Sequence, residues 1–98
     1  MKNWKREKYL GWKDWYSWNV ALYIDNIYPV YIQAMDLIQD YQTKYRNKKD
    51  TIQRIHNAMI FHFGIKTPDG ARITKTAIKE WFDLNKDNQY TSLNNRKN

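Results

Sequence analysis

Residues 11–28 read GWKDWYSWNVALYIDNIY, and we expect the rest of the chain to be organised around this stretch. It holds three of the five tryptophans, and each large aromatic side chain can bury on the order of 150–250 Å². Ser17 is a residue type that caps helices, because its hydroxyl accepts from free N–H groups of the first turn. A helix over 17–26 is therefore predicted. The residues expected at the hub of the core are Trp15, Trp18 and Leu22.

Two longer helices are predicted after this one. Pro29 suits the first turn of a helix, and apolar residues then recur every three or four positions as far as Tyr45, which is the rhythm of a one-faced helix. A charged loop follows, and either Asp50 or Thr51 can cap the next helix. Gly64 stands where that helix should end, because glycine readily adopts the left-handed conformation found there.

A turn and a fourth helix complete the expected fold. Residues 67–70 are Thr-Pro-Asp-Gly, in which proline presets a dihedral, aspartate accepts local hydrogen bonds and glycine allows positive φ. The flanking isoleucines could pair as a minimal β-hairpin near 65–73, and Thr74 can cap the last helix. That helix is expected to contribute to the core with Ala77, Ile78, Trp81, Phe82 and Leu84. The sequence thus predicts an all-α fold, a small four-helix domain.

Length and composition indicate a single domain over 1–98. The chain has no cysteine, which excludes disulfides and thiolate metal sites and fits a reducing cytoplasm. Its basic N-terminal segment has no apolar run of a signal peptide behind it, and no stretch approaches the roughly 20 apolar residues of a membrane span. Residues 1–13 read as a basic N-terminal arm, or as a lead-in that packs a tryptophan on the core. Residues 86–98 read as a flexible tail.

The net charge of +7 favours binding to anionic partners. Nucleic acid, an acidic protein surface and an anionic membrane all fit such a charge. A membrane is the weakest of the three, because the cations are not gathered on one helix face opposite apolar residues. The competing interpretation is a solvated basic surface, since abundant Lys, Asn, Ile and Tyr are typical of an AT-rich coding sequence.

Three groups of cations are the candidates for binding phosphate or an acidic partner. Binding to the phosphate backbone of a nucleic acid requires only well-placed Lys and Arg side chains. The candidates are Lys5, Arg6, Lys8 and Lys13 in the arm, Lys44, Arg46, Lys48, Lys49 and Arg54 around the charged loop, and Lys66, Arg72, Lys75 and Lys79 near the last helix. Exposed aromatic rings beside such cations can stack on bases. The candidates for stacking are Trp4, Trp12 and Tyr45.

Catalytic patterns are missing from the sequence. It contains no cysteine nucleophile, no Gly-x-Ser-x-Gly motif and no phosphate-cradling glycine loop. His56 and His62 are six residues apart, so on one helix they lie roughly 120° apart and cannot share a metal ion. The acidic residues form no close pair suited to acid–base work. We therefore expect a non-enzymatic protein without metal or cofactor.

Two motifs resemble the signature of a family of small proteins encoded by phages and mobile elements. In the first, Tyr23 replaces the usual tryptophan, and the residues that match are Trp12, Trp15, Ser17, Trp18, Asn19, Val20, Ala21, Leu22, Ile24 and Asn26. The second is a turn before a helix with a tryptophan, matched here by Thr67, Pro68, Asp69, Gly70 and Trp81. Residues 31–65 show no such match. The resemblance implies a phage or mobile-element origin and carries no reaction with it.

By association with other small basic phage proteins, the resemblance implies an inhibitor of a host defence system, similar to anti-CRISPR proteins. Such an inhibitor would act in the cytoplasm of the host cell on a defence protein or ribonucleoprotein, with or without RNA as a direct ligand. The alternatives are a general nucleic-acid-binding accessory protein and a virion structural protein. The oligomeric state is left open by the sequence.

Overall fold

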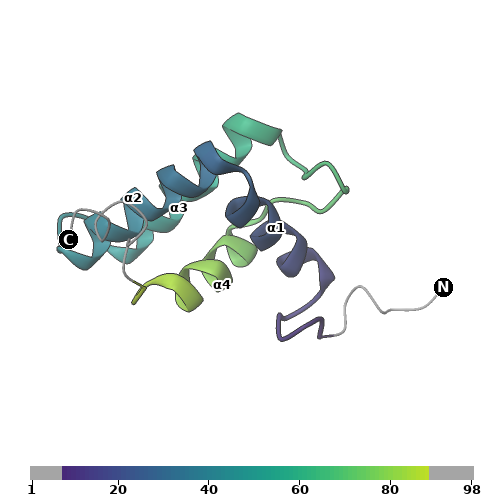
Figure 1. Ribbon diagram of the computed structural model, residues 1–98, viewed down its shortest axis with the longest axis horizontal. Helices are drawn as coiled ribbons and strands as arrows, with labels where there is room; N and C mark the ends of the chain where they lie inside the picture. The colour runs from purple at the N-terminus through teal and green to yellow at the C-terminus, as the bar shows by residue number, and fades with distance from the viewer. Residues whose placement is uncertain (1–7, 89–98) are drawn as a thin grey trace.

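The computed structural model describes residues 8–88, which form four α-helices (Figure 1). The helices are α1 (Trp15–Asn26), α2 (Tyr28–Gln42), α3 (Lys48–Phe63) and α4 (Lys75–Asn85). The prediction of a small all-α domain of four helices is thereby confirmed. α2 packs on α3 and α1 packs on α4, while contacts of α1 with α2 and of α3 with α4 close a ring around one core. None of these four helices is long and apolar enough to cross a lipid bilayer.

The N-terminal caps of two helices differ from the prediction. α1 begins at Trp15, and its cap is Asp14, whose Oδ1 accepts from the backbone N–H of Ser17 at 2.9 Å. Ser17 itself lies buried inside the helix. α3 is capped by Asn47, whose Oδ1 accepts from Asp50 N at 2.8 Å. In both cases a strong capping residue stands earlier in the chain, so the helix begins there and the predicted cap lies in its first turn.

The ends of the helices follow backbone geometry. Pro29 lies in the first turn of α2, as predicted. α2 ends at Gln42 instead of continuing toward Tyr45, because Lys44 turns the chain with a φ of 65°. Gly64 ends α3 with a φ of 85°, which confirms the expected positive dihedral.

Thr74 caps α4 as predicted, since its Oγ1 accepts from Ala77 N at 3.1 Å. The segment before this cap contains no strand. The expected hairpin is reduced to one isolated bridge between Lys66 and Arg72, with Ile73 N donating to the carbonyl of Ile65 at 2.9 Å. The two chain segments that flank the turn have too few paired residues to form a β-ladder.

The centre of the core is built by α4. Trp81 and Phe82 are both 0% exposed, and α1 faces the core with smaller side chains, Val20, Ala21 and Ile24. The predicted hub of Trp15, Trp18 and Leu22 is therefore wrong, because all three are only half-buried. Large rings on one helix are complemented by smaller side chains on the facing helix.

Two further contacts define the edges of this core. The Trp18 ring packs on Tyr9 with centroids 4.9 Å apart. The indole N–H of Trp81 donates to Asp25 of α1 at 2.9 Å. Burial raises the pKa of Asp25, and the hydrogen bond from Trp81 partly opposes that shift. Leu84 was also expected in the core, but it is 59% exposed because it lies on the flank of the buried stripe of α4.

The described part of the basic arm packs against the domain. Tyr9 and Trp12 exchange two backbone hydrogen bonds, of 2.9 and 2.8 Å, around a tight turn at Leu10 and Gly11. Lys13 N donates to the Glu80 carboxylate of α4 at 2.8 Å. The earlier arm residues, with the candidates Trp4, Lys5 and Arg6, lie outside the described residues.

Candidate nucleic-acid interface

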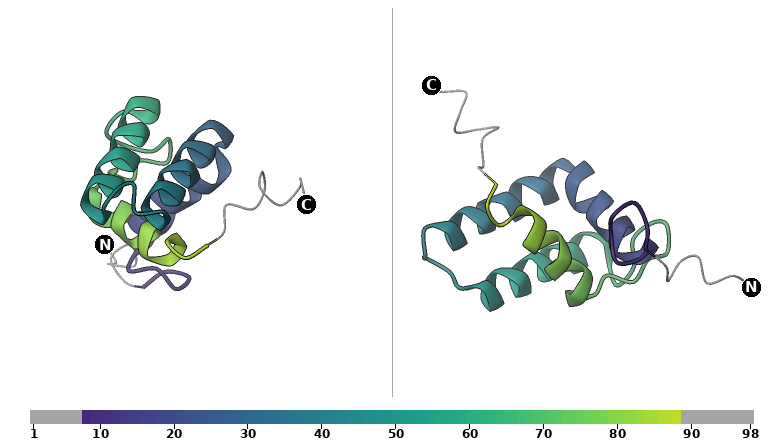
Figure 2. Two further views of the ribbon diagram at one scale, coloured as in Figure 1. Left: turned by 90° about the vertical axis from the view of Figure 1, so that its left-hand side faces the viewer. Right: turned by 90° about the horizontal axis from the view of Figure 1, so that it is seen from below.

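A basic groove lies where the α2–α3 loop meets the chain that follows α4. Both segments are found at the same end of the molecule, opposite the tight turn of the N-terminal segment (Figure 2). The groove has a volume of about 610 Å³. Its walls are formed by Tyr41, Gln42, Lys44, Arg46, Asn47, Lys48, Lys86 and Asp87. Four of these side chains are cationic and only one is acidic, so the groove suits an anion.

The backbone around the groove is held in place by hydrogen bonds. The amide Nε2 of Gln42 donates to the carbonyls of Lys86 at 2.9 Å and Asn88 at 2.6 Å, which attaches the described start of the tail to the end of α2. The backbone N–H groups of Tyr45 and Arg46 both donate to the carbonyl of Asp40, at 2.9 and 3.1 Å. The two walls of the groove are therefore fixed relative to each other.

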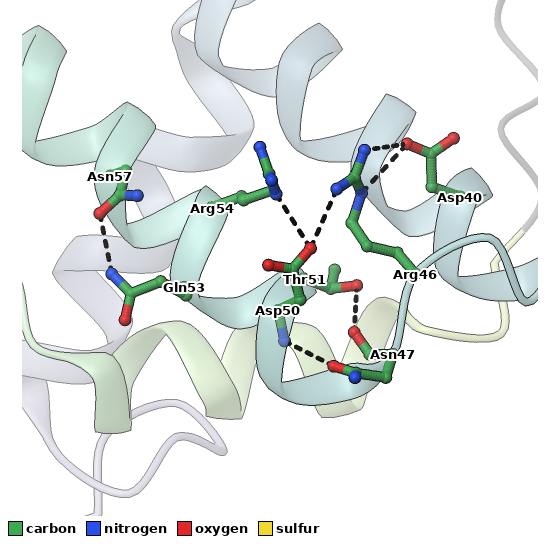
Figure 3. A network of polar contacts seen from close by, with 8 residues as sticks. All are labelled: Asp40, Arg46, Asn47, Asp50, Thr51, Gln53, Arg54 and Asn57. Atoms are coloured by element: carbon green, nitrogen blue, oxygen red, sulfur yellow. Dashed lines mark hydrogen bonds and ion pairs between the residues drawn. The ribbon is translucent and has the colours of Figure 1, made fainter.

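Arg46 sits between two carboxylates (Figure 3). Its Nη2 and Nε lie 3.1 and 3.2 Å from Oδ2 of Asp40, and its Nη1 lies 2.9 Å from Oδ2 of Asp50. Arg54 Nε reaches the same Asp50 oxygen at 2.9 Å. Hydrogen bonds from Arg46 and then Arg54 lower the pKa of Asp50. The candidates Arg46 and Arg54 therefore belong to a network that connects α2 to α3.

Lys48 is also engaged within the fold. Its ammonium lies 3.2 Å from Oδ1 of Asp83 in α4 and 5.7 Å from the centroid of the Phe82 ring. Lys79 approaches the other oxygen of Asp83 at 3.0 Å. Hydrogen bonds from Lys79 and Lys48 lower the pKa of Asp83. Lys48 thus connects the start of α3 to α4 while lining the groove.

Other cations make no ion pair with any residue between 8 and 88. Lys44 and Lys86 are in this class, and both line the basic groove. Lys49 and Lys75 line a neighbouring hollow of about 400 Å³ that also includes Lys48 and has Ile52 in its wall. The groove and this hollow share Lys48, so the two are neighbours.

The remaining candidates lie elsewhere. Lys13 and Arg72 line a separate hollow of about 410 Å³ between the N-terminal segment and the start of α4. Lys8 and Lys66 are exposed outside these hollows. Lys44, Arg46, Lys48, Lys49 and Lys75 thus line the groove or the hollow beside it, whereas Arg54 lines a different hollow of about 290 Å³ with Gln33 and Phe61. Lys8, Lys13 and Arg72 are not among the residues that line the groove or the hollow beside it.

Aromatic candidates differ in their exposure. Trp12 is half-buried beside Tyr9, whereas Tyr45 is 75% exposed in the α2–α3 loop. The guanidinium carbon of Arg46 lies 5.2 Å from the centroid of the Tyr45 ring, which is the geometry of a cation–π contact. Tyr45 does not itself line the basic groove, but its chain neighbours Lys44 and Arg46 do, whereas Trp12 is not among the residues that line it.

Sequence reasoning missed several residues of the groove. Lys86 falls in the predicted flexible tail, and Gln42 is one of several polar residues of the second predicted helix. No local sequence pattern predicts that either residue lines the groove, because both positions depend on the contact between the end of α2 and the chain after α4. Asn47 could have been found as a cap, since an Asn before a helix is a strong capping residue.

Histidine and carboxylate groups show no arrangement of a metal site within residues 8–88. His56 Nε2 lies 3.0 Å from the backbone carbonyl of Ile73, which makes it a link between α3 and the segment before α4. The ring of His62 packs edge-on against Phe63 with centroids 4.6 Å apart. Both histidines thus have structural contacts away from the basic groove.

Comparison with known proteins gives a family match. A family model described as "Family of unknown function (DUF7249)" matches residues 5–90, which covers all four helices. No curated protein matches the chain significantly. The same holds for solved structures.

Proposed function

This chain belongs to DUF7249, a family of unknown function, and we propose from its geometry that it is a non-enzymatic protein that binds the phosphate backbone of nucleic acid in the basic groove. The observation that carries the proposal is the pair Lys44 and Lys86. Both line the groove, Lys44 from the α2–α3 loop and Lys86 from the chain after α4, and neither makes an ion pair within the described chain. A phosphate that enters between them can accept from both ammonium groups.

The paired cations support this site in a different way. Arg46 and Lys48 are held by Asp40, Asp50 and Asp83, so their positions on the groove walls are fixed. Ordered cations lose little side-chain entropy when a ligand binds. The groove thus combines two positioned cations with two lysines that make no ion pair within the described chain, and the adjacent hollow adds Lys49 and Lys75.

The composition of the walls favours binding over catalysis. Among residues 8–88, no histidine lines the groove, and Asp87 is the one carboxylate on its walls. General acid–base or nucleophilic chemistry uses paired groups within hydrogen-bond reach, such as a nucleophile and its base. Gln42 and Asn47 offer neutral hydrogen bonds to a sugar or a phosphate, which adds affinity without a reaction.

The biological setting in this proposal comes from the resemblance of the two sequence motifs. We propose that the protein is encoded by a phage or mobile element and counteracts a host defence system in the host cytoplasm, in the manner of an anti-CRISPR protein. A host defence ribonucleoprotein offers RNA phosphates to the groove and a protein surface beside them. A general nucleic-acid-binding accessory role uses the same groove without a defence target.

The test measures binding of a labelled mixed-sequence RNA by fluorescence anisotropy as a function of salt. Reversing both free lysines, in Lys44→Glu/Lys86→Glu, is expected to weaken binding at least tenfold and to reduce the slope of log affinity against log salt by about 2. The matched control is Lys8→Glu/Lys66→Glu, which changes the net charge equally at exposed positions outside the groove. An equal loss in the control, or binding insensitive to salt, would contradict the proposal.

A second measurement addresses the setting. The tagged protein is recovered from host lysate with and without nuclease, and both RNA and protein in the sample are identified. Recovery of a defence ribonucleoprotein by the parent chain, but not by Lys44→Glu/Lys86→Glu, is expected. Recovery of bulk cellular RNA with no defence component would favour the accessory role.

A further inference from the structure

We propose that the basic groove selects single-stranded nucleic acid, because an unpaired base stacks on the exposed face of Tyr45. This inference rests on the proposed function and adds to it the class of ligand. It concerns the same face of the molecule, and it uses an aromatic side chain that phosphate binding alone leaves without a role.

Tyr45 is presented to solvent by the fold. It lies in the α2–α3 loop, directly after the left-handed residue Lys44, and its side chain is 75% exposed. The hydrogen bond from its backbone N–H to the carbonyl of Asp40, at 2.9 Å, holds the residue in place. A tyrosine exposed to this extent contributes little to the core, so its ring is available to a ligand.

One face of the ring is backed by a fixed cation. The guanidinium carbon of Arg46 lies 5.2 Å from the ring centroid, and the guanidinium is held by Asp40 and Asp50 (Figure 3). This arrangement restricts the ring from one side and leaves it in contact with no other aromatic ring of the described chain. The result is a supported platform with an open face.

The platform lies next to the phosphate site. Lys44 directly precedes Tyr45 in the chain and lines the groove, as does Arg46 on its other side. The Tyr45 ring lies outside the groove lining, beside Arg46, so a nucleotide whose base covers this ring would extend its phosphate toward Arg46 and Lys44. Successive contacts of this kind, a base on an aromatic ring and a phosphate on a cation, are how proteins follow a single strand.

Double-stranded nucleic acid cannot use this platform. Each base of a duplex already has both faces covered by its neighbours, so an aromatic ring gains contact only with a base that is unpaired. A duplex can still place phosphates in the groove. Tyr45 should therefore separate the two ligands, whereas Lys44 and Lys86 should affect both.

The test compares one RNA strand with the same strand annealed to its complement, using anisotropy on the full chain. Tyr45→Ala should weaken single-strand binding about five- to hundredfold and change duplex binding less than about twofold. Tyr45→Phe keeps the ring and should retain single-strand affinity. Tyr28→Ala is the matched control, because Tyr28 is 68% exposed at the start of α2, outside the groove.

The possible outcomes distinguish selection of single strands by Tyr45 from phosphate binding in the groove. Unchanged single-strand affinity in Tyr45→Ala, or an equal loss for strand and duplex, overturns the inference. If Lys44→Glu/Lys86→Glu still weakens both ligands in that case, phosphate binding stands and only strand selection fails. Failure of the parent chain to bind either ligand overturns both. Loss of a captured protein partner in Tyr45→Ala, with RNA binding intact, would assign the ring to a protein interface instead.

Discussion

The buried side chain of Asn19 in α1 donates from Nδ2 to Oδ2 of Asp69, in the turn before α4, at 2.8 Å. Its Oδ1 accepts from the hydroxyl of Thr67, and that hydroxyl oxygen accepts in turn from Ala71 N at 3.1 Å. The two sequence motifs therefore meet in space and form one structural unit. Asn19 therefore has a structural role, and it is not among the residues that line the basic groove.

Removing this amide should destabilise the fold strongly. Asn19→Ala leaves Thr67 and the Asp69 carboxylate without their partner beside the core, and an unsatisfied buried polar group costs about 1–3 kcal/mol in addition to the lost packing. We expect the free energy of unfolding in urea to fall by about 2–4 kcal/mol. Asn19→Asp should be at least as damaging, because it places a second carboxylate against Asp69.

Asn26→Ala is the matched control for this prediction. Asn26 is on the same helix and bonds only to the carbonyl of Leu22, at 2.8 Å, in an exposed position. Its replacement should change the free energy of unfolding by less than about 1 kcal/mol. Equal effects of the two alanine variants would show that the Asn19 network does not hold the turn.

The carboxylate of Asp25 should oppose folding at neutral pH. Burial raises its pKa above 3.8 in the folded state, so the neutral form is favoured there, and protonation as pH falls stabilises the folded state. Asp25→Asn keeps an oxygen that can accept from Trp81 and removes this titration. We expect the stability of the variant relative to the parent to be greatest at about pH 7 and to decrease as pH falls toward 3.8. An advantage that grows on acidification would mean that the folded pKa is lowered.

Asp50 should show the opposite pH dependence. Arg46 and Arg54 lower its pKa below the ordinary 3.8, so its stabilising contribution is present above that value and is lost as pH falls through the folded pKa. Urea unfolding of the parent should therefore become easier in acid, and Asp50→Asn should flatten the curve in that range. The two curves should converge at pH values below the folded pKa. A constant difference at every pH would exclude the charge as the cause.

Two residues of α4 test the position of the core. Ile78 is 0% exposed and Leu84 is 59% exposed, although both follow the apolar pattern of the helix. Ile78→Ala should lower the free energy of unfolding by about 2–5 kcal/mol, because it leaves a cavity. Leu84→Ala should change it by less than about 0.5 kcal/mol. Comparable losses at both positions would indicate that Leu84 is covered by a part of the chain beyond residue 88.

The fold was predictable where a local signal decides the structure. Thr74 and Gly64 mark helix boundaries through capping and positive φ, which depend on neighbours in sequence. The hub of the core was not predictable in this way, because α1 has two apolar faces. One carries the predicted Trp15, Trp18 and Leu22, and the other carries the buried Val20, Ala21 and Ile24. The choice between them depends on Trp81 and Phe82, far along the chain, and these rings favour the side of α1 with smaller side chains.

In the candidate site, too, local features were predictable from the sequence and long-range contacts were not. The sequence showed the cations around the charged loop, since clustering is local. It did not show that Asp40 and Asp50 hold Arg46, because the two acids flank the cluster on either side of a turn whose geometry brings them together. Lys86 joins the groove only through the contact of Gln42 with the chain after α4, a relationship across 44 positions. Long-range contacts of this kind have no signature in a single sequence.

Asp87 provides the sharpest test of where the ligand lies. It is the one acidic side chain on the walls of the basic groove, it is exposed, and it makes no ion pair within residues 8–88. Asp87→Asn should therefore leave stability unchanged and strengthen binding of single-stranded and duplex RNA several-fold at low salt. Asp36→Asn changes the net charge equally on the exposed side of α2, outside the groove, and should strengthen binding less. Because the two variants differ in position and not in charge, equal gains would mean that RNA responds to the net charge of the molecule rather than to the groove.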